Sequence, residues 1–437
     1  MKVRNVTAVV VGAGQAGLAV SRELSRRNID HLVLEKGTVG HAWRTARWDS
    51  LRLLTPNWAN GLPGARYRGP DPLGFMAARA FVDTLDAYAE RISAPLELET
   101  EVLEVRRTEP GFRLMTNRGP LGCRALVVAT GGCAEASVPG FASGLPGQIV
   151  QTTPSRYKRP SDLPAGGVLV VGASASGVQI ARELQASGRP VTLSVGSHLR
   201  LPRRYRGCDI EWWLDALGIL DETLEEVDDI ARVRRTPSPQ IIGGPHPVDL
   251  AALQDSGIEI VGRLAAIRDD MALFSGALAH VCKAADLKLA RLLQRIDDWA
   301  AGHAPEALGT VADRPDPTPI PAAPRLSLDL SSGEIASIVW ATGYRPDHAW
   351  LSGLPIFDRR GRLAHNGGVV RGVPGLYALG LPFLRRRRSP QISGAGPDAY
   401  DIAADLEALL RHSPGPALAP LAPPVRSARP AHFRRVL

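Results

Sequence analysis

The sequence predicts an α/β fold with two similar parallel sheets, because one glycine-rich pattern occurs twice along the chain. Each copy follows a short apolar segment, at residues 8–11 and 168–171, and leads into a segment with the apolar spacing of a helix. The two copies are Gly12-Ala13-Gly14-Gln15-Ala16-Gly17 and Gly172-Ala173-Ser174-Ala175-Ser176-Gly177, and Arg22-Glu23-Leu24 recurs in the same register as Arg182-Glu183-Leu184. This duplication indicates two Rossmann-like dinucleotide-binding domains in one polypeptide.

Each position of the pattern has a physical role in holding a pyrophosphate. The first glycine permits the tight turn, the second lets the backbone approach the pyrophosphate, and the third lets helix and strand pack closely. The free N–H groups and the positive dipole end of the helix then meet the anion. Ser174 replaces the middle glycine of the second copy with another small residue. The predicted cofactor-binding residues of the two loops are Gly12, Gly14, Gln15, Ala16 and Gly17, and Gly172, Ser174, Ser176 and Gly177.

The residues after the second strand of each copy favour different nucleotides. In the first copy Glu35 stands near the place, about 20 residues beyond the glycines, where an acid accepts a hydrogen bond from a free ribose 2′-hydroxyl. In the second copy Val195 stands at the equivalent place, and Ser197 and Arg200 follow, which favours a 2′-phosphate and therefore NADPH over NADH. The alternative is a solvated basic turn made of Arg200, Arg203, Arg204 and Arg206.

Two further segments predict where the chain crosses between the domains. Strands expected at 124–128 and 337–340 end in Ala129-Thr130-Gly131-Gly132 and Ala341-Thr342-Gly343-Tyr344, whose glycines permit close backbone approach to a cofactor. We therefore expect the second domain to be inserted in the first and to carry a long helix at 278–300. The predicted division is a first part of the first domain at 1–157, a second domain with a helical insertion at 158–338, the rest of the first domain at 339–412 and an irregular tail at 413–437.

Composition argues against several other classes of function. The net charge is +8, but the basic residues are mostly arginine and no aromatic residues alternate with them, so we expect no nucleic-acid partner. No apolar run reaches the ~18 residues of a membrane span, and we expect a cytoplasmic protein without a membrane partner. The sequence leaves open whether the chain forms a homodimer. No metal is predicted, because the four cysteines, Cys123, Cys133, Cys208 and Cys282, form neither a metal-ligand pattern nor the close redox pair of a disulfide reductase.

Together the motifs resemble those of the class B flavin-dependent monooxygenases. The resemblance extends over nearly the whole chain and includes residues 40–44, 50–56 and 62–64 and the Ala-Thr-Gly-Tyr-Arg-Pro-Asp motif at 341–347. It implies that the first domain binds FAD and that the second binds NADPH. The further cofactor-binding residues expected on this basis are Lys36, Trp43, Arg44, Leu51, Thr130, Gly131, Ala341, Thr342, Gly343 and Gly380.

The resemblance also implies an activity. NADPH would pass a hydride to the flavin, dioxygen would add at the flavin C4a atom, and the resulting (hydro)peroxide would deliver one oxygen atom to a nitrogen, sulfur or carbonyl group of a small organic substrate. We expect Trp43, Trp48 and Trp58 to surround the flavin and exclude water, and a helix that starts near Pro397 to direct its positive end at the ring.

Two places depart from the family pattern. Leu145, Gly147 and Gln151 stand where the family has F-x-G-x-x-x-H, and Pro56 stands where many relatives have asparagine, with Asn57 adjacent. We therefore take Asn57 and Gln151 as the candidate catalytic residues. The alternatives are a reductase or oxidase that passes electrons to an external acceptor or to O2 without oxygen transfer, and a flavin-bound redox sensor without catalytic activity.

Overall fold

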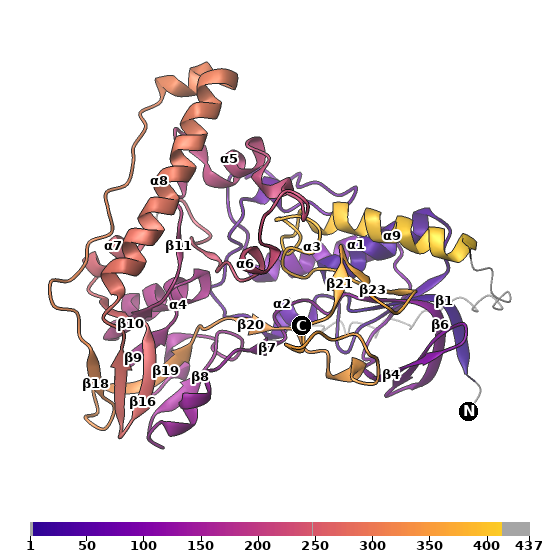
Figure 1. The fold of residues 1–437 in the computed structure, drawn as a ribbon, viewed down its shortest axis with the longest axis horizontal. Helices are drawn as coiled ribbons and strands as arrows, with labels where there is room; N and C mark the ends of the chain where they lie inside the picture. The colour runs from indigo at the N-terminus through magenta and orange to yellow at the C-terminus, as the bar shows by residue number, and fades with distance from the viewer. Residues whose placement is uncertain (1–2, 247, 413–437) are drawn as a thin grey trace, which may run out of the picture.

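The computed structural model describes residues 3–246 and 248–412, and two parallel sheets form its framework (Figure 1). The first sheet has the strand order β21-β22-β23-β6-β1-β2-β3. From β23 to β3 all neighbouring strands are parallel, and β4 (Val102–Thr108) and β5 (Gly111–Thr116) continue from β6 as antiparallel strands. The bounds of the main path are β1 Arg4–Val11, β2 His31–Leu34, β3 Leu96–Glu97, β6 Gly119–Val128, β21 His365–Asn366, β22 Val369–Val370 and β23 Leu376–Ala378.

The second sheet repeats the parallel arrangement of the first. Its order is β15-β10-β9-β19-β8, and every neighbouring pair is parallel. The strand before each glycine loop, β1 or β9, lies between two parallel neighbours. This arrangement confirms the α/β fold with two Rossmann-like sheets. The strand bounds are β8 Val150–Thr152, β9 Gly167–Val171, β10 Val191–Val195, β15 Glu259–Gly262 and β19 Ile335–Trp340.

Along the sequence, the segment that forms the second sheet is inserted between strands of the first sheet. All strands of the second sheet lie between β6 and β21, as the predicted insertion requires. One predicted boundary is wrong: β8 falls within the segment 1–157 assigned to the first domain, yet it pairs with β19 of the second sheet. The strand has only three residues and no buried position, so no apolar pattern marks it. The predicted tail at 413–437 lies outside the described residues.

A helix follows each glycine loop. Helix α1 (Gln15–Arg26) buries Ala16, Val20 and Leu24, the side chains with the predicted helical spacing, and it packs against α9 (Ala395–His412). Helix α4 (Ala175–Ala186) occupies the same place in the second domain. Helices α2 (His41–Thr45) and α3 (Ala78–Arg91) pack against each other in the first domain.

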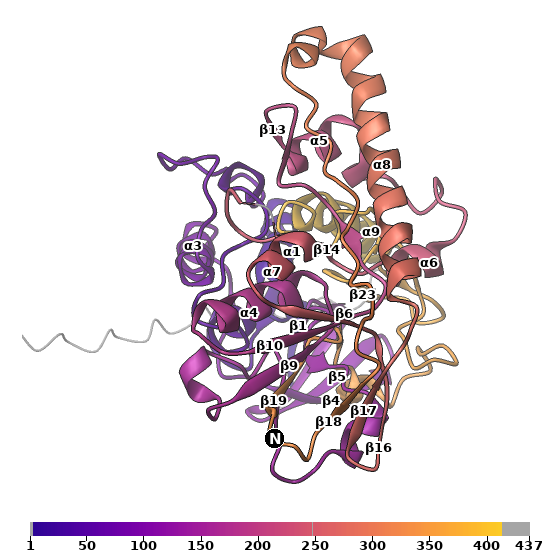
Figure 2. The same cartoon turned by 90° about the vertical axis from the view of Figure 1, so that its left-hand side faces the viewer.

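The helical insertion extends away from the sheets (Figure 2). Its longest element is α8 (Leu278–His303), which matches the helix predicted at 278–300. The upper part of α8 packs on α5 (Ile210–Ala216), where Leu293 and Ile296 share a core with Trp213. Within the described ranges no helix is long and apolar enough to cross a membrane.

The remaining elements are short and connect these parts. A three-stranded antiparallel sheet flanks the second sheet, and further small helices and strand pairs complete the second domain and its insertion. The bounds are β16 Leu264–Arg268, β17 Met271–Phe274, β18 Ser327–Asp329, β11 Leu199–Arg200, β14 Pro239–Gln240, β12 Arg204–Tyr205, β13 Cys208–Asp209, α6 Ile230–Arg234 and α7 Leu250–Asp255.

The two crossings between the domains lie side by side. Strand β7 (Glu135–Ala136) pairs with β20 (Tyr344–Arg345) in the antiparallel direction. The pairing continues through the Ser137 N–H, which donates to the Gly343 carbonyl at 2.9 Å, and through the Thr342 hydroxyl, which donates to the Ser137 carbonyl at 2.6 Å. The domains are therefore joined by a hydrogen-bonded two-stranded bridge rather than by two independent linkers.

The four consecutive arginines at 385–388 form an arginine clamp between α9 and the insertion. The first two arginines pair with carboxylates of α9, and the last two pair with carboxylates that follow or belong to α5. The pairs are Arg385 with Asp401 and Asp405, Arg386 with Asp398 and Asp401, Arg387 with Glu222, and Arg388 with Asp215 and Asp221. This dense basic cluster is thus neutralised by carboxylates of the same chain.

Candidate active site

The carboxyl ends of the first sheet bring the predicted FAD residues to one edge. Gly12 follows β1, Glu35 follows β2, Thr130 lies beyond β6 and Gly380 lies beyond β23. These strands are parallel, so their carboxyl ends meet at the same edge, and β1 has β6 on one side and β2 on the other. Such a reversal of strand order opens the crevice in which α/β sheets bind nucleotides.

Steric contacts within the protein explain Gly12 and Gly17 of the first loop but not Gly14. Gly12 has φ +109°, and a methyl group there would lie 2.6 Å from the Ala129 carbonyl oxygen. A methyl group on Gly17 would lie 1.8 Å from the Gly12 carbonyl oxygen, so only glycine lets α1 pack on the turn. A methyl group on Gly14 would meet nothing within 4 Å. The protein therefore leaves space beside Gly14 and the start of α1, where a pyrophosphate would bind.

Glu35 is fixed against this loop. It is 8% exposed, and its carboxylate accepts hydrogen bonds from the Ala13 N–H at 2.8 Å and the Gly37 N–H at 3.2 Å. A carboxylate has further acceptor capacity, so this geometry fits the predicted contact with a ribose hydroxyl. The side chain of the adjacent Lys36 is exposed.

An unpaired hydroxyl group and open space occur at the same edge of the sheet, beyond β6. The buried Thr130 hydroxyl has no hydrogen-bond partner among the described residues. Gly131 has φ +78° with nothing within 4 Å of a methyl group placed on it. Gly380 has φ +76°, and a methyl group there would approach the Ala16 side chain to 3.0 Å. An unpaired buried hydroxyl is rare in native proteins, so these features fit a bound cofactor at this edge.

The other side chains predicted around the flavin lie in three different places. Trp43 lies beside the loop, because its indole N–H donates to Gln15 Oε1 at 3.0 Å. Arg44 instead donates to the Val39 carbonyl at 3.0 Å and pairs with Asp86, so it anchors α2 to α3. Trp48 and Leu51 are buried in a core that they share with β9 and α4, so they pack between the two domains.

The second loop repeats the geometry of the first. Gly172 has φ +108°, and a methyl group on it would lie 2.4 Å from the Ala341 carbonyl oxygen. A methyl group on Gly177 would lie 1.8 Å from the Gly172 carbonyl oxygen. Ser174 is the N-cap of α4 but makes no capping hydrogen bond, and Ser176 is partly exposed in the first turn. Both hydroxyls therefore lie at the helix N-terminus, where a second pyrophosphate would bind.

Thr342 differs from its counterpart Thr130. Its hydroxyl donates to Ser137 in the interdomain bridge, so the predicted cofactor contact through this side chain is not supported. The adjacent Gly343 is exposed, with φ +96° and no atom within 4 Å of a methyl group placed on it.

Arg200 requires a correction. Its guanidinium is 5% exposed and donates to Asp249 at 2.7 Å, to Asp286 at 3.0 Å and to the Asp316 carbonyl at 2.6 Å. It therefore holds α7, α8 and the loop before β18 together, and it neither reaches a 2′-phosphate nor belongs to a solvated turn. The sequence could not show that these three acidic residues, distant along the chain, surround it.

A different arginine lies where the 2′-phosphate was predicted. Ser197 is exposed just beyond β10, and Arg263 is exposed just beyond the neighbouring strand β15. The register pairs Val195 with Gly262, and a methyl group on Gly196 would lie 3.6 Å from the Arg263 side chain. Sequence reasoning missed Arg263, although the short apolar run that ends at Gly262 indicates a strand whose carboxyl end could meet that of β10.

The two candidate catalytic residues lie in different surroundings, because Asn57 is buried and Gln151 is exposed. The Asn57 side chain is 5% exposed, donates to the Asp71 carbonyl at 2.8 Å and accepts from the Met76 N–H at 2.8 Å. Gln151 lies on the edge strand β8 and accepts a hydrogen bond from the Trp340 indole at 2.9 Å. Both amides make hydrogen bonds within the protein that hold their own segments in place, and their catalytic roles stay predictions.

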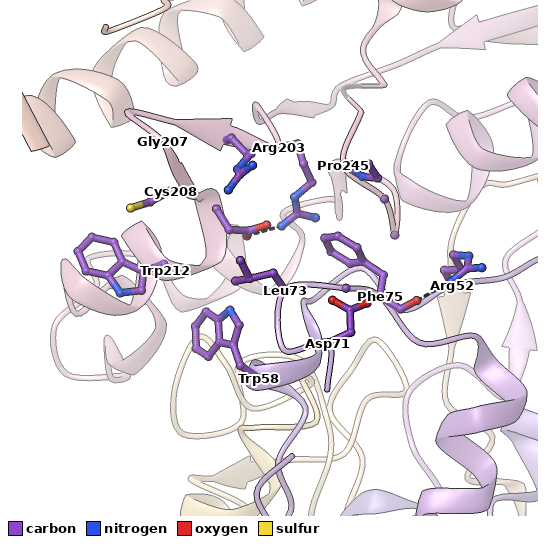
Figure 3. Close-up of a pocket in the computed structure, with 15 residues that line it drawn as sticks. Arg52, Trp58, Asp71, Leu73, Phe75, Arg203, Gly207, Cys208, Trp212 and Pro245 are labelled. Atoms are coloured by element: carbon purple, nitrogen blue, oxygen red, sulfur yellow. Dashed lines mark hydrogen bonds and ion pairs between the residues drawn. The ribbon is translucent and has the colours of Figure 1, made fainter. Parts of the chain in front are cut away.

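A cleft of about 630 Å³ lies between the first domain and the insertion (Figure 3). Residues 52–75 form one wall, and residues 203–212 and 243–245 form the other. A methyl group on Gly243 would lie 2.3 Å from the Leu53 carbonyl oxygen, so the two walls meet at the floor. Trp58, predicted to surround the flavin, lines this cleft.

One buried carboxyl lies behind the cleft. Glu211, in the first turn of α5, is 7% exposed, and its Oε1 atom has no hydrogen-bond partner within the described chain. Burial raises the pKa of Glu211 to about 7, although the nearby Arg203 guanidinium opposes the shift.

The fold and the two matched loops define a flavoprotein-type oxidoreductase with two dinucleotide sites. A model of the pyridine nucleotide-disulphide oxidoreductase family matches residues 9–214. An uncharacterized CzcO-like oxidoreductase of Geobacillus kaustophilus is 32% identical over 92% of this chain and 98% of its own length. The indole-3-pyruvate monooxygenase YUCCA6 of Arabidopsis thaliana is 31% identical over 91% of this chain and 89% of its own.

A solved structure has the same fold. The flavin-containing monooxygenase of Stenotrophomonas maltophilia aligns with a TM-score of 0.65 and 19% identity, covering 93% of this chain and 99% of that one. With the relatives that match along nearly their whole length, the chain belongs to the class B flavin-dependent monooxygenase family.

The open space beside Gly14 predicts a selective loss of cofactor. Gly14 has an extended backbone with φ −83°, so Gly14→Ala should leave the thermal stability of the apoprotein unchanged while a methyl group obstructs the pyrophosphate. We expect at least about tenfold weaker FAD binding, which is ~1.4 kcal/mol. Titration of apoprotein with FAD measures it. The matched variant Gly17→Ala should lower stability even without FAD, and wild-type affinity in Gly14→Ala would contradict the site.

Glu211 predicts a pH-dependent gain in stability. The folded protein retains the Glu211 proton between pH 4.5 and about 7 while the unfolded chain releases it, so stability falls as pH rises through this window. Glu211→Gln removes this penalty and should raise the free energy of unfolding at pH 8 by up to about 3 kcal/mol, with little change at pH 4. Urea unfolding at both pH values measures it. The control Glu90→Gln alters an exposed position, and an equal change at both pH values for Glu211→Gln would contradict the prediction.

Proposed function

We propose that the protein is an NADPH-dependent flavoprotein monooxygenase that binds FAD and places one oxygen atom on a nitrogen, sulfur or carbonyl group of a small organic substrate. In the overall reaction NADPH, a proton, dioxygen and the substrate give NADP⁺, water and the oxygenated substrate. The observation that carries the proposal is the pair of superimposable glycine turns, each with open space at a helix N-terminus, in a chain of the flavin monooxygenase family.

The first domain would hold FAD, which when bound supplies electron transfer and dioxygen activation. The Gly12–Gly17 turn and the start of α1 would bind the pyrophosphate, and Glu35 would accept from the ribose. The Thr130 hydroxyl, which lacks a protein partner, would donate to a polar cofactor atom. The N-terminal end of α9 would stabilise negative charge on the reduced cofactor.

The second domain would hold NADPH. The turn at Gly172 and the start of α4 would bind its pyrophosphate, with the Ser174 and Ser176 hydroxyls as additional donors. Ser197 and Arg263 would bind the 2′-phosphate, because both are exposed at the carboxyl ends of adjacent parallel strands and no acid competes at Val195. The interdomain bridge would then keep the two cofactors within one rigid unit.

A second candidate function is a reductase or oxidase that passes electrons to an external acceptor or to O2. One observation favours it: Asn57 and Gln151, the polar side chains at the two departures from the family pattern, are both used in structural hydrogen bonds. The two functions differ in the fate of dioxygen, which is measurable.

Arg263→Gln tests the choice of nucleotide. Losing one charge-assisted contact with a phosphate costs ~1.5–3 kcal/mol, so the Michaelis constant for NADPH should rise roughly ten- to hundredfold while that for NADH stays the same. Steady-state kinetics with both nucleotides measure the effect. The control Arg268→Gln removes an exposed arginine of β16 and should change neither constant. Equal effects of Arg263→Gln on both nucleotides would contradict the assignment.

Oxygen transfer is tested by following labelled dioxygen. With a phenyl thioether as acceptor, we expect NADPH consumption to yield a sulfoxide that carries one labelled oxygen atom, and the hydrogen peroxide formed per NADPH to fall as the acceptor concentration rises. Mass spectrometry of the product and a peroxide assay measure both quantities. One peroxide formed per NADPH, with no sulfoxide at any acceptor concentration, would instead establish the oxidase function.

A further inference from the structure

The cleft between residues 52–75 and the insertion has two chemically different parts. Figure 3 shows Trp58, Leu73 and Trp212 gathered at one end and Arg52 at the other. Leu73 is 61% exposed and Trp212 is 39% exposed, which is unusual for large apolar side chains that lie near one another. This end offers an apolar surface to a ligand.

The polar part of the cleft carries an excess of positive charge. Three guanidinium groups line it, from Arg52, Arg203 and Arg204, together with the carboxylates of Asp71 and Asp209. Asp209 is neutralised by Arg203 at 2.5 Å. Arg52 and Arg204 therefore face the single remaining carboxylate, Asp71. Behind the wall Glu211 is buried, and burial favours its neutral form.

Arg203 is a fixed hydrogen-bond donor at the wall of the cleft. Its side chain is only 3% exposed, its guanidinium donates to the Leu54 carbonyl at 2.8 Å, and it lies 4.8 Å from the centre of the Phe75 ring. Its buried Nε–H has no acceptor among the residues that the structure describes. Burying a guanidinium with an unused donor is costly, and an anion at the cleft wall would offset that cost.

Arg204, next to Arg203 in the sequence, is exposed to solvent. It lies on β12 and makes no ion pair within residues 3–246 and 248–412. A side chain of this kind can move toward a ligand without breaking an internal contact. A carboxylate is the anion that a guanidinium binds best in planar, two-point geometry.

We propose that this cleft binds the substrate and selects a small molecule with an aryl or alkyl body and one carboxylate. The apolar body packs on Trp58, Leu73 and Trp212, and the carboxylate binds at Arg203 and Arg204. That the bound molecule is the substrate rests on the proposed function, whereas the preference for a carboxylate rests on the residues of the cleft. Arg52, at the far end of the cleft, follows Leu51, which is buried between the domains. The cleft volume of about 630 Å³ suits a small organic molecule.

Three phenyl thioethers that differ only in charge test the proposal: 3-(phenylthio)propanoate, 3-(phenylthio)propan-1-ol and 3-(phenylthio)propan-1-amine. Isothermal titration of the FAD-loaded protein measures binding, and sulfoxide formation with NADPH measures turnover. We expect the carboxylate to bind at least about tenfold more tightly than the alcohol and the amine to bind least tightly.

Variants of the residues that line the cleft distinguish specific binding of the carboxylate from nonspecific hydrophobic binding. Arg204→Gln should weaken binding of the carboxylate several-fold and leave the alcohol unchanged, and Asp71→Asn should strengthen binding of the carboxylate. Trp212→Ala should weaken all three ligands to a similar extent. Arg204 and Asp71 are exposed, so their variants should fold as the wild type does. The Trp212 ring packs against Trp213 and Trp299, so the melting temperature of Trp212→Ala checks that this variant is folded.

The outcomes distinguish the two proposals. Tight binding of the carboxylate that responds to Arg204 and Asp71, without sulfoxide, supports the cleft as a carboxylate site and refutes oxygen transfer to sulfur. Equal binding and turnover of all three thioethers, or preference for the amine, overturns the carboxylate inference while leaving the monooxygenase proposal intact.

Discussion

The arrangement depends on one steric constraint, which occurs twice: a helix packs directly on the turn that precedes it. At Gly17 and at Gly177 the space for a side chain is closed by a carbonyl oxygen 1.8 Å away, and at Gly12 and Gly172 a carbonyl of the neighbouring strand closes it. This contact holds strand, turn and helix close together, so the N-terminus of the helix lies at the carboxyl edge of the sheet. Because the neighbouring strands are parallel, the residues that follow them lie at the same edge, and together these groups form a nucleotide site.

The two sites can cooperate only if the domains keep a fixed relation. The β7–β20 bridge joins the crossing segments through backbone hydrogen bonds, and Trp48 and Leu51 of the first domain are buried in the core of the second. On the opposite side the arginine clamp ties α9 to the insertion. Single exposed ion pairs contribute little. In the clamp, however, Asp401 pairs with both Arg385 and Arg386, and Arg388 pairs with two carboxylates, so several of these ion pairs form a network. The cleft lies between these attachments.

The fold was predictable because its signals are local. Strand, turn and helix follow one another within the two glycine loops, and the helix at 278–300 shows its own apolar period. The surroundings of single side chains depend instead on distant partners. Arg200 matched the expected position after β10 but is surrounded by Asp249 and Asp286, whereas the exposed Arg263 lies beyond the end of the neighbouring strand β15. Asn57 stood beside the family's asparagine position, yet its amide holds residues 71–76. The short β8 carries no burial pattern at all.

The central claim is that one chain holds both cofactors and transfers the hydride internally. Anaerobic mixing of FAD-loaded protein with NADPH, followed through the visible absorbance of the flavin, tests it most directly. The account predicts complete bleaching of the bound flavin, with a first-order rate that saturates with NADPH concentration and does not change with protein concentration. Failure to bleach, or bleaching that occurs only with added free flavin in proportion to its concentration, would contradict it.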